Sequence, residues 1–168
     1  RSQVDWYEVA EMYHTQTFAH DCRLSSLADE WQREVAALWR LEVDVNNGGY
    51  LQFLANWGRE AYVYARRGLE KIGAHRMGKL VDTCQALIDE HVDADGSGRY
   101  QLGDVMPNRV VGQDGKTMKD AGCTLPGVAI DRIHELSRRF MGYPDRLAEL
   151  GTQHYSRYID KEGTDQKV

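Results

Sequence analysis

The sequence lacks the features that mark several large classes of protein. No run of apolar residues approaches the roughly 20 that a membrane-spanning helix needs, so no membrane segment is expected. Cysteine is scarce: Cys22, Cys84 and Cys123 are widely spaced and odd in number, and no Cys-x-x-Cys pair occurs. This pattern argues against a disulfide framework or a zinc site and favours reduced thiols in a cytoplasmic protein.

A catalytic signature is also missing. No glycine-rich phosphate-binding loop follows a predicted strand. His134-Glu135 begins a metalloprotease-like pair, but Arg138 stands where the second zinc-binding histidine is required. No residue stands out as a nucleophile. We therefore expect a protein that is not an enzyme, and an uncharacterised enzyme stays open as an alternative.

The net charge of −5 is mild, but the excess of acids is confined to the first part of the chain. Up to Glu60, ten acidic residues are set against five basic ones, and beyond that point acids and bases balance. Nucleic-acid binding needs a basic face, so no direct contact with DNA or RNA is expected. The imbalance favours a basic protein partner, although an ordinary solvated surface would show it too. The oligomeric state is left open.

Apolar residues recur at helical spacing along most of the chain, which predicts an all-α fold in a single compact domain. The domain is expected over residues 1–160, followed by a frayed tail over 161–168. Glycine, aspartate, asparagine and proline dominate from about 93 to 125, which predicts one long loop with a small β-hairpin around Asp114-Gly115. The expected helices span 4–17, a segment from a Ser25 or Ser26 cap to Asn46, 50–57 and 61–72 on either side of Gly58, 77–91, and two helices that open at Pro126 and Pro144.

The stretch VDVNNGGYLQF, from Val43 to Phe53, places four weak helix formers between two predicted helices. Asparagine can cap a helix, and glycine allows positive φ and a close approach of two backbones. The stretch therefore predicts a tight turn between the helices. Beyond it, Gln52 and Asn56 lie at i,i+4 on one helical face, where their amides can bond each other or the turn. Local geometry accounts for this pattern, and an exposed amide-lined pocket is the alternative.

The same segment, VNNGGYLQFLAN, followed by LEKIGA from Leu69, resembles the bacterial DNA-mimic-like family. The resemblance implies a helical fold and a protein partner. Most members have no assigned function, and the strongly acidic ones use carboxylates to imitate DNA phosphates and occupy a helix-turn-helix regulator. This chain is only mildly acidic, so the fold transfers better than the mimicry. The residues that carry the family motif are Asn46, Asn47, Gly48, Gly49, Tyr50, Gln52, Phe53, Asn56 and Gly73.

Acidic residues in the first two predicted helices supply the expected binding surface. Side chains at i,i+3 and i,i+4 lie about 5–6 Å apart on a helix and can imitate a short row of phosphates. We expect a non-enzymatic protein that binds a partner, such as a basic DNA-binding regulator, through this surface. The residues assigned to it, all expected to face solvent, are Asp5, Glu8, Glu11, Asp29, Glu30 and Glu34.

The segment DADGSGRYQLGD competes with this hypothesis because it matches the calcium loop of an EF-hand. Asp93, Asp95, Ser97 and Asp104 fall at loop positions 1, 3, 5 and 12, and Gly98 takes the required position 6. However, position 12 is normally a bidentate glutamate, and Gly103 weakens the exit helix. The alternative is therefore a calcium-stabilised structural module, against an acidic turn that ends the preceding helix.

Overall fold

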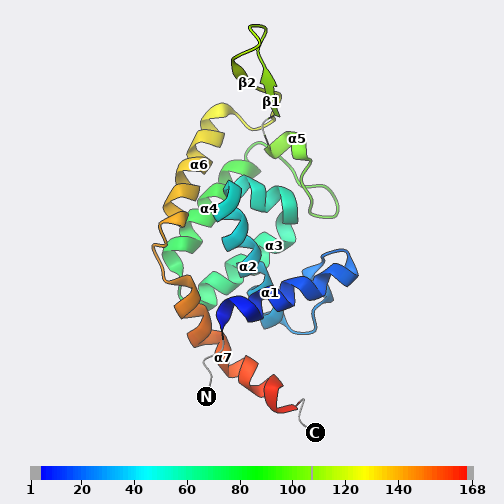
Figure 1. Ribbon diagram of the computed structural model, residues 1–168, viewed down its shortest axis with the longest axis vertical. Helices are drawn as coiled ribbons and strands as arrows, with labels where there is room; N and C mark the ends of the chain where they lie inside the picture. Colours follow the sequence, from blue (N-terminus) through cyan, green and yellow to red (C-terminus); the bar gives the residue numbers. More distant parts are fainter. Residues whose placement is uncertain (1–4, 107, 166–168) are drawn as a thin grey trace.

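Two long antiparallel helices, α2 and α3, form the centre of the fold, and a single residue, Gly49, joins them (Figure 1). The computed structural model describes residues 5–106 and 108–165. Its elements are α1 (Trp6–Gln16), 3₁₀ turns at Thr17–His20 and Leu24–Ser26, α2 (Glu30–Gly48), α3 (Tyr50–Ile72), α4 (His75–Asp89), α5 (Leu102–Val105), β1 (Asn108–Val111), β2 (Met118–Ala121), α6 (Gly127–Met141) and α7 (Leu147–Asp165).

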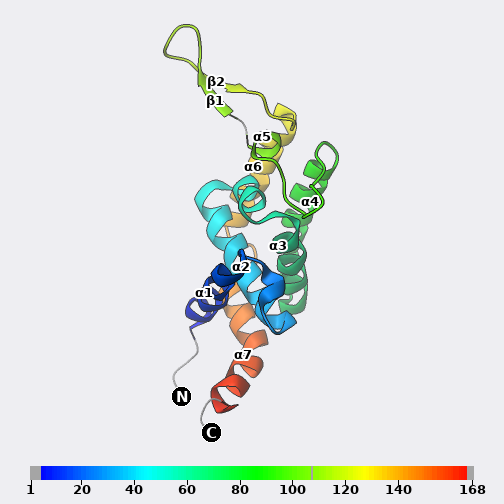
Figure 2. The same cartoon turned by 90° about the vertical axis from the view of Figure 1, so that its right-hand side faces the viewer.

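Apolar stripes on α2 and α3 meet in the core, where Leu38, Leu41, Phe53 and Leu69 are fully buried. The remaining helices pack around this pair, with α1 and α7 at one end and α4 and α6 along one side (Figures 1 and 2). The all-α prediction is confirmed. In the described part of the chain, no helix combines the length and apolar character needed to span a membrane.

The start of α2 differs from the prediction. Ser25 and Ser26 do not cap it, because the chain forms a 3₁₀ turn there and enters the helix only after Asp29. Asp29 and Gln32 make a reciprocal capping box, in which the Gln32 Oε1 accepts from the Asp29 backbone N–H at 3.2 Å. This arrangement satisfies two backbone donors that the helix itself leaves unpaired.

The two predicted segments on either side of Gly58 are one helix, α3, with a kink at that residue. Gly58 has φ 72° and ψ −166°, a backbone conformation that L side chains rarely adopt. A Cβ atom at this position would lie 2.7 Å from the Gly98 carbonyl oxygen, so the loop after α4 approaches the kink at its backbone. The adjacent Arg59 N–H donates to the same oxygen at 2.8 Å.

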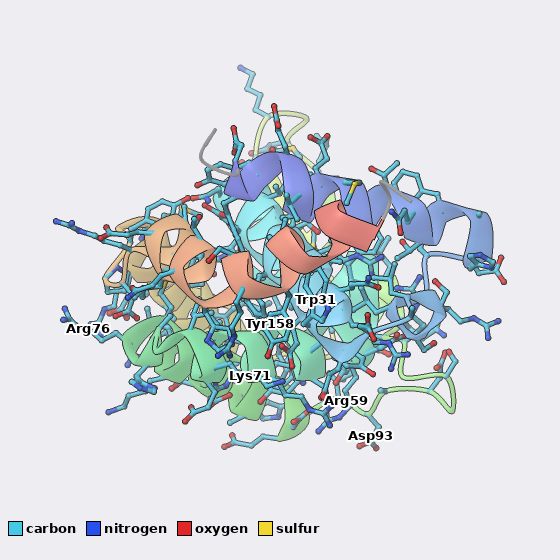
Figure 3. All side chains as sticks on the ribbon, turned by 90° about the horizontal axis from the view of Figure 1, so that it is seen from below. Trp31, Arg59, Lys71, Arg76, Asp93 and Tyr158 are labelled. Carbon is cyan, nitrogen blue, oxygen red and sulfur yellow. The ribbon has the colours of Figure 1, made fainter. Side chains whose placement is uncertain are left out.

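Aromatic pairs hold α7 against the first two helices. The Trp6 and Tyr155 rings stack at 5.9 Å between centroids, and Trp31 and Tyr158 stack at 5.5 Å (Figure 3). Helix α7 continues to Asp165, five residues beyond the predicted domain boundary at residue 160. The last part of the predicted tail over 161–168, residues 166–168, lies outside the described residues.

The long loop contains more structure than the sequence suggested. The short helix α5 precedes an antiparallel hairpin in which Val111 pairs with Met118 and Asn108 with Ala121. The predicted turn at Asp114-Gly115 is confirmed: Gly115 has φ 69°, and the Asp114 carboxylate accepts the Lys116 and Thr117 N–H groups at 2.9 and 2.8 Å. The hairpin stands away from the helical body at one end (Figures 1 and 2).

Candidate functional site

The outer face of α1 presents three acidic residues to solvent. Asp5, Glu8 and Glu11 are all exposed, as expected. Asp5 caps the helix by accepting the Tyr7 N–H at 2.9 Å. Within the described residues, no basic side chain forms an ion pair with any of the three. Their negative charge is therefore available to a partner.

The inner face of α1 is fixed by a buried basic pair. The His14 Nδ1 accepts a hydrogen bond of 3.0 Å from the Arg40 Nε, and the His14 ring stacks on Trp39 at 4.3 Å. The Arg40 guanidinium also lies 4.2 Å from the centroid of the Trp57 ring. Burial, reinforced by the positive charge of Arg40, lowers the pKa of His14 to about 4. His14 is thus neutral at physiological pH and holds α1 with its acids outward.

The acidic residues Glu30 and Glu34 of α2 are paired with basic residues, unlike those of α1. Glu34 is fully buried, where its carboxylate accepts from the Lys71 Nζ and, at 2.9 Å, from the Tyr155 hydroxyl. Glu30 is exposed but pairs with Arg67 at 2.9 Å. The expectation that Glu34 faces solvent is therefore wrong, because α3 and α7 cover that side of α2.

The Asn-Gly-Gly turn is as tight as the sequence predicted. Gly49 has φ 85°, and a Cβ atom there would lie 3.3 Å from the Ser137 Oγ of α6. The next residue, Tyr50, donates its backbone N–H to that Oγ at 3.0 Å. The turn therefore joins α2 to α3 and also docks both on α6. Gly73, the last glycine of the motif, ends α3 with φ 80°.

The motif amides converge on one carboxylate of α2, which sequence reasoning did not single out. Asp44 is 7% exposed and accepts the Gln52 Nε2 at 3.1 Å, the Asn56 Nδ2 at 3.0 Å and the Trp57 Nε1 at 2.7 Å. Asn47 extends the network by donating to the Gln52 Oε1 at 3.3 Å. These bonds use the amides to fasten the turn, which agrees with the local-geometry interpretation.

A second buried carboxylate, Glu42, orients two exposed tyrosines beside α1. Its Oε1 accepts from the Tyr7 hydroxyl at 3.0 Å and from the Tyr143 hydroxyl at 2.8 Å. The motif residue Asn46 donates to the Tyr143 hydroxyl at 2.8 Å. Burial raises the pKa of Glu42, while the two phenols oppose that shift. Burial, together with Glu42, raises the pKa of Tyr7 to about 12, so this phenol stays a hydrogen-bond donor. No spacing in the sequence indicates this contact, which joins residues of α1, α2 and the turn after α6.

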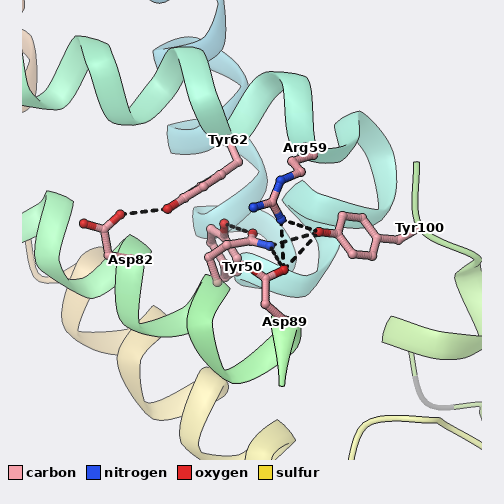
Figure 4. A network of polar contacts seen from close by, with 7 residues as sticks. Tyr50, Arg59, Tyr62, Asp82, Asp89 and Tyr100 are labelled. Atoms are coloured by element: carbon pink, nitrogen blue, oxygen red, sulfur yellow. Dashed lines mark hydrogen bonds and ion pairs between the residues drawn. The ribbon is translucent and has the colours of Figure 1, made fainter. Parts of the chain in front are cut away.

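Tyr50 of the motif anchors a polar network between α3, α4 and the following loop (Figure 4). Its hydroxyl donates to the Gln85 Oε1 at 2.8 Å, and the Gln85 Nε2 donates to the Asp89 Oδ1 at 2.8 Å and the Tyr100 hydroxyl at 3.0 Å. Arg59 completes the network with an ion pair of 3.0 Å to Asp89. Tyr50 and Phe53 are both buried, so their role in the motif is to build the core.

The four predicted calcium ligands do not converge. The Asp95 Oδ1 accepts the Ser97 N–H at 2.8 Å and the Arg99 N–H at 3.0 Å, while Asp104 accepts from the Thr124 hydroxyl. Asp93 is exposed at the edge of the molecule (Figure 3). Among the described residues, no three His, Cys, Asp or Glu side chains form a group that could hold a metal. Calcium binding therefore stays a prediction that would require the loop to rearrange.

The comparison with protein families gives one match, which covers most of the chain. The family profile described as "DMP19-like protein" matches residues 25–162, from the 3₁₀ turn before α2 into α7. It includes every residue of the Asn-Gly-Gly motif but not α1. No curated protein and no solved structure matches the chain significantly. The extent of the profile match shows that the chain belongs to the DMP19-like protein family.

Proposed function

We propose that this protein is a non-enzymatic, DNA-mimic-type protein that binds a basic, DNA-binding regulator in the cytoplasm. The observation that carries the proposal is the exposed row of carboxylates on α1, formed by Asp5, Glu8 and Glu11 without basic partners among the described residues. The family assignment supports the mimic class. Because α1 precedes the matched residues, the binding face is proposed from this chain's own geometry.

The density of charge on α1 suits a short piece of a DNA strand. From Asp5 to Glu11 the helix rises by about 9 Å, at 1.5 Å per residue. One strand of B-DNA carries roughly three phosphates over a similar length, at about 3.4 Å per phosphate along the axis. The three carboxylates would therefore replace a local set of phosphate contacts. They would not replace a whole operator.

Two rigid aromatic side chains beside the acids can anchor the partner. Tyr7 and Tyr143 are 47% and 41% exposed, and Glu42 holds both hydroxyl groups. Tyrosine is enriched among residues that dominate binding energy, partly because ordering its ring costs little conformational entropy. The charged row would then steer a basic partner, while the tyrosines would supply apolar contact area.

A bait experiment with the full chain tests the proposal. The immobilised protein is used to capture DNA-binding proteins from extracts of the source organism, and each captured regulator is purified. We expect its affinity to fall steeply with salt, because exposed charges are screened. We also expect its own operator DNA to compete, and Glu8→Lys together with Glu11→Lys to weaken binding by roughly tenfold or more.

The matched control reverses two acids elsewhere, Glu90→Lys with Asp93→Lys. Both residues are exposed, and Figure 3 shows Asp93 on the side away from α1. The control carries the same net charge as the α1 variant, so it should keep nearly wild-type affinity. Equal losses in the two double variants would show only a net-charge effect. Simultaneous binding of operator DNA and this protein to the regulator would refute mimicry.

A further inference from the structure

Helices α4 and α6 form a groove with a character opposite to that of α1. On α4, Arg76, Lys79, Leu80 and Thr83 share one face at helical spacing. On α6, Arg132, Leu136 and Arg139 likewise share one face. Pro144, beyond the end of α6, also lines the groove. The space between the two faces has a volume of about 480 Å³.

The basic side chains at the rim are accessible. The side chains of Arg76 and Arg139 are 77% and 58% exposed. Arg132 and Arg139 share one carboxylate, that of Glu135, at 2.7 and 2.8 Å. Lys79 is exposed and makes no ion pair with any described residue. Four cations thus surround the groove against two carboxylates, Glu135 and Asp145, and Asp145 lies 3.7 Å from Arg76. Positive charge is still in excess there, in a protein that is acidic as a whole.

The floor of the groove is apolar. Leu136 is buried, and Leu80 and Pro144 are half-buried. A ligand that fits this arrangement needs negative groups toward the rim and apolar groups toward the floor, because desolvating the leucines is favourable only against apolar surface.

We infer that the groove between α4 and α6 binds an acidic peptide segment of a partner protein, with carboxylates on the rim cations and one or two apolar side chains on the leucine floor. Charge complementarity selects acidic residues, and the floor selects a peptide over a nucleic acid. A phosphate backbone has no apolar side chains to place against Leu80 and Leu136. This site uses residues separate from the α1 surface, so the two proposals are tested independently.

The test uses the full chain and a fluorescently labelled synthetic peptide that forms a helix with glutamate on one face and leucine on the other. We expect saturable binding by fluorescence anisotropy. The double variant Lys79→Glu/Arg139→Glu should weaken the affinity by roughly tenfold or more, because two rim attractions become repulsions. A control that reverses two exposed bases elsewhere, Arg23→Glu with Arg157→Glu, should bind nearly as the wild type does, and thermal melts should confirm that all variants fold.

Three results would overturn the inference. The first is equal affinity for the groove variant and the control variant. The second is undiminished binding of a peptide whose leucines are replaced by serine, since the floor would then play no part. The third is a duplex DNA fragment that binds more tightly than the acidic peptide and loses its affinity in the groove variant, which would make the groove a phosphate site.

Discussion

Two rows of acidic residues at similar helical spacing, one on α1 and one on α2, have opposite fates in this protein. Glu8 and Glu11 of α1 are exposed and have no basic partner among the described residues, whereas Glu30 and Glu34 of α2 pair with Arg67 and Lys71. The difference arises because α1 lies at the edge of the helical body, while α2 is enclosed by α3 and α7. Helical spacing places carboxylates on one face, and the packing of neighbouring helices decides whether that face is available to a partner.

The sharpest way to break this comparison is to reverse one charge in each row. Glu34→Lys places an ammonium group in a buried site against Lys71 and removes the acceptor of the Tyr155 hydroxyl. We expect it to lower the free energy of unfolding by about 3–5 kcal/mol. Glu8→Lys on the exposed face should change it by less than about 0.5 kcal/mol. Urea unfolding of both variants measures the difference, and similar stabilities would show that Glu34 is not buried as described.

A substitution in the Asn-Gly-Gly turn tests what aligns α2 with α3. Gly49→Val puts a β-branched residue at φ 85° and close to the Ser137 Oγ. We expect a loss of about 1–3 kcal/mol in the free energy of unfolding, because such residues resist positive φ. Gly73→Val is a useful comparison: it also has positive φ, at 80°, but no atoms lie within 4 Å of its added Cβ. Any greater loss at Gly49 therefore reports the contact with α6, and an unchanged stability at Gly49 would contradict the described turn.

Acidification should lower the free energy of unfolding through His14, which lies on the inner face of α1. The pKa of His14 is lowered from 6.5 to about 4 in the folded protein, so the unfolded chain binds the proton more readily. This contribution to stability is complete above the unfolded pKa and declines as the pH falls toward 4. We expect a loss of about 2 kcal/mol between roughly pH 7 and 5. Urea titrations at several pH values measure the free energy of unfolding of the wild type and of His14→Gln. We expect this free energy to depend less steeply on pH in the variant. Parallel curves for the two proteins would show that His14 does not cause the acid destabilisation.

The smallest effect is expected from calcium, which concerns a third acidic segment, the loop from Asp93 to Asp104. Asp95 and Asp104 already accept hydrogen bonds from within the protein, and calcium would have to replace these hydrogen bonds. We expect thermal melts in calcium and in chelator to differ little. A site of micromolar affinity would instead add about 2.7 kcal/mol at a hundredfold excess of ligand, and such a gain would establish the calcium module.

Local patterns in the sequence determined most of the helices. The apolar spacing of α1, α3 and α4 predicted their existence and their buried faces, because a 3.6-residue period leaves one stripe to bury. An interruption of the helix at Gly58, the turn at Gly49 and the hairpin at Asp114-Gly115 were also predicted, since glycine and asparagine mark backbone conformations that other residues resist. The cap of α2 was misplaced, because Asp29 and the two serines before it are all acceptable capping residues.

Only the tertiary structure decided which polar residues are free. No sequence pattern marks Asp44 or Glu42 as special. Each nevertheless accepts hydrogen bonds from residues elsewhere in the chain, as Glu42 does from Tyr7 and Tyr143. The sequence predicts Glu34 on the surface, whereas α3 and α7 bury it in the folded protein. The reason is physical: local spacing fixes the direction of a side chain on its own helix. The position of another helix opposite that side chain depends on how all the apolar stripes pack together.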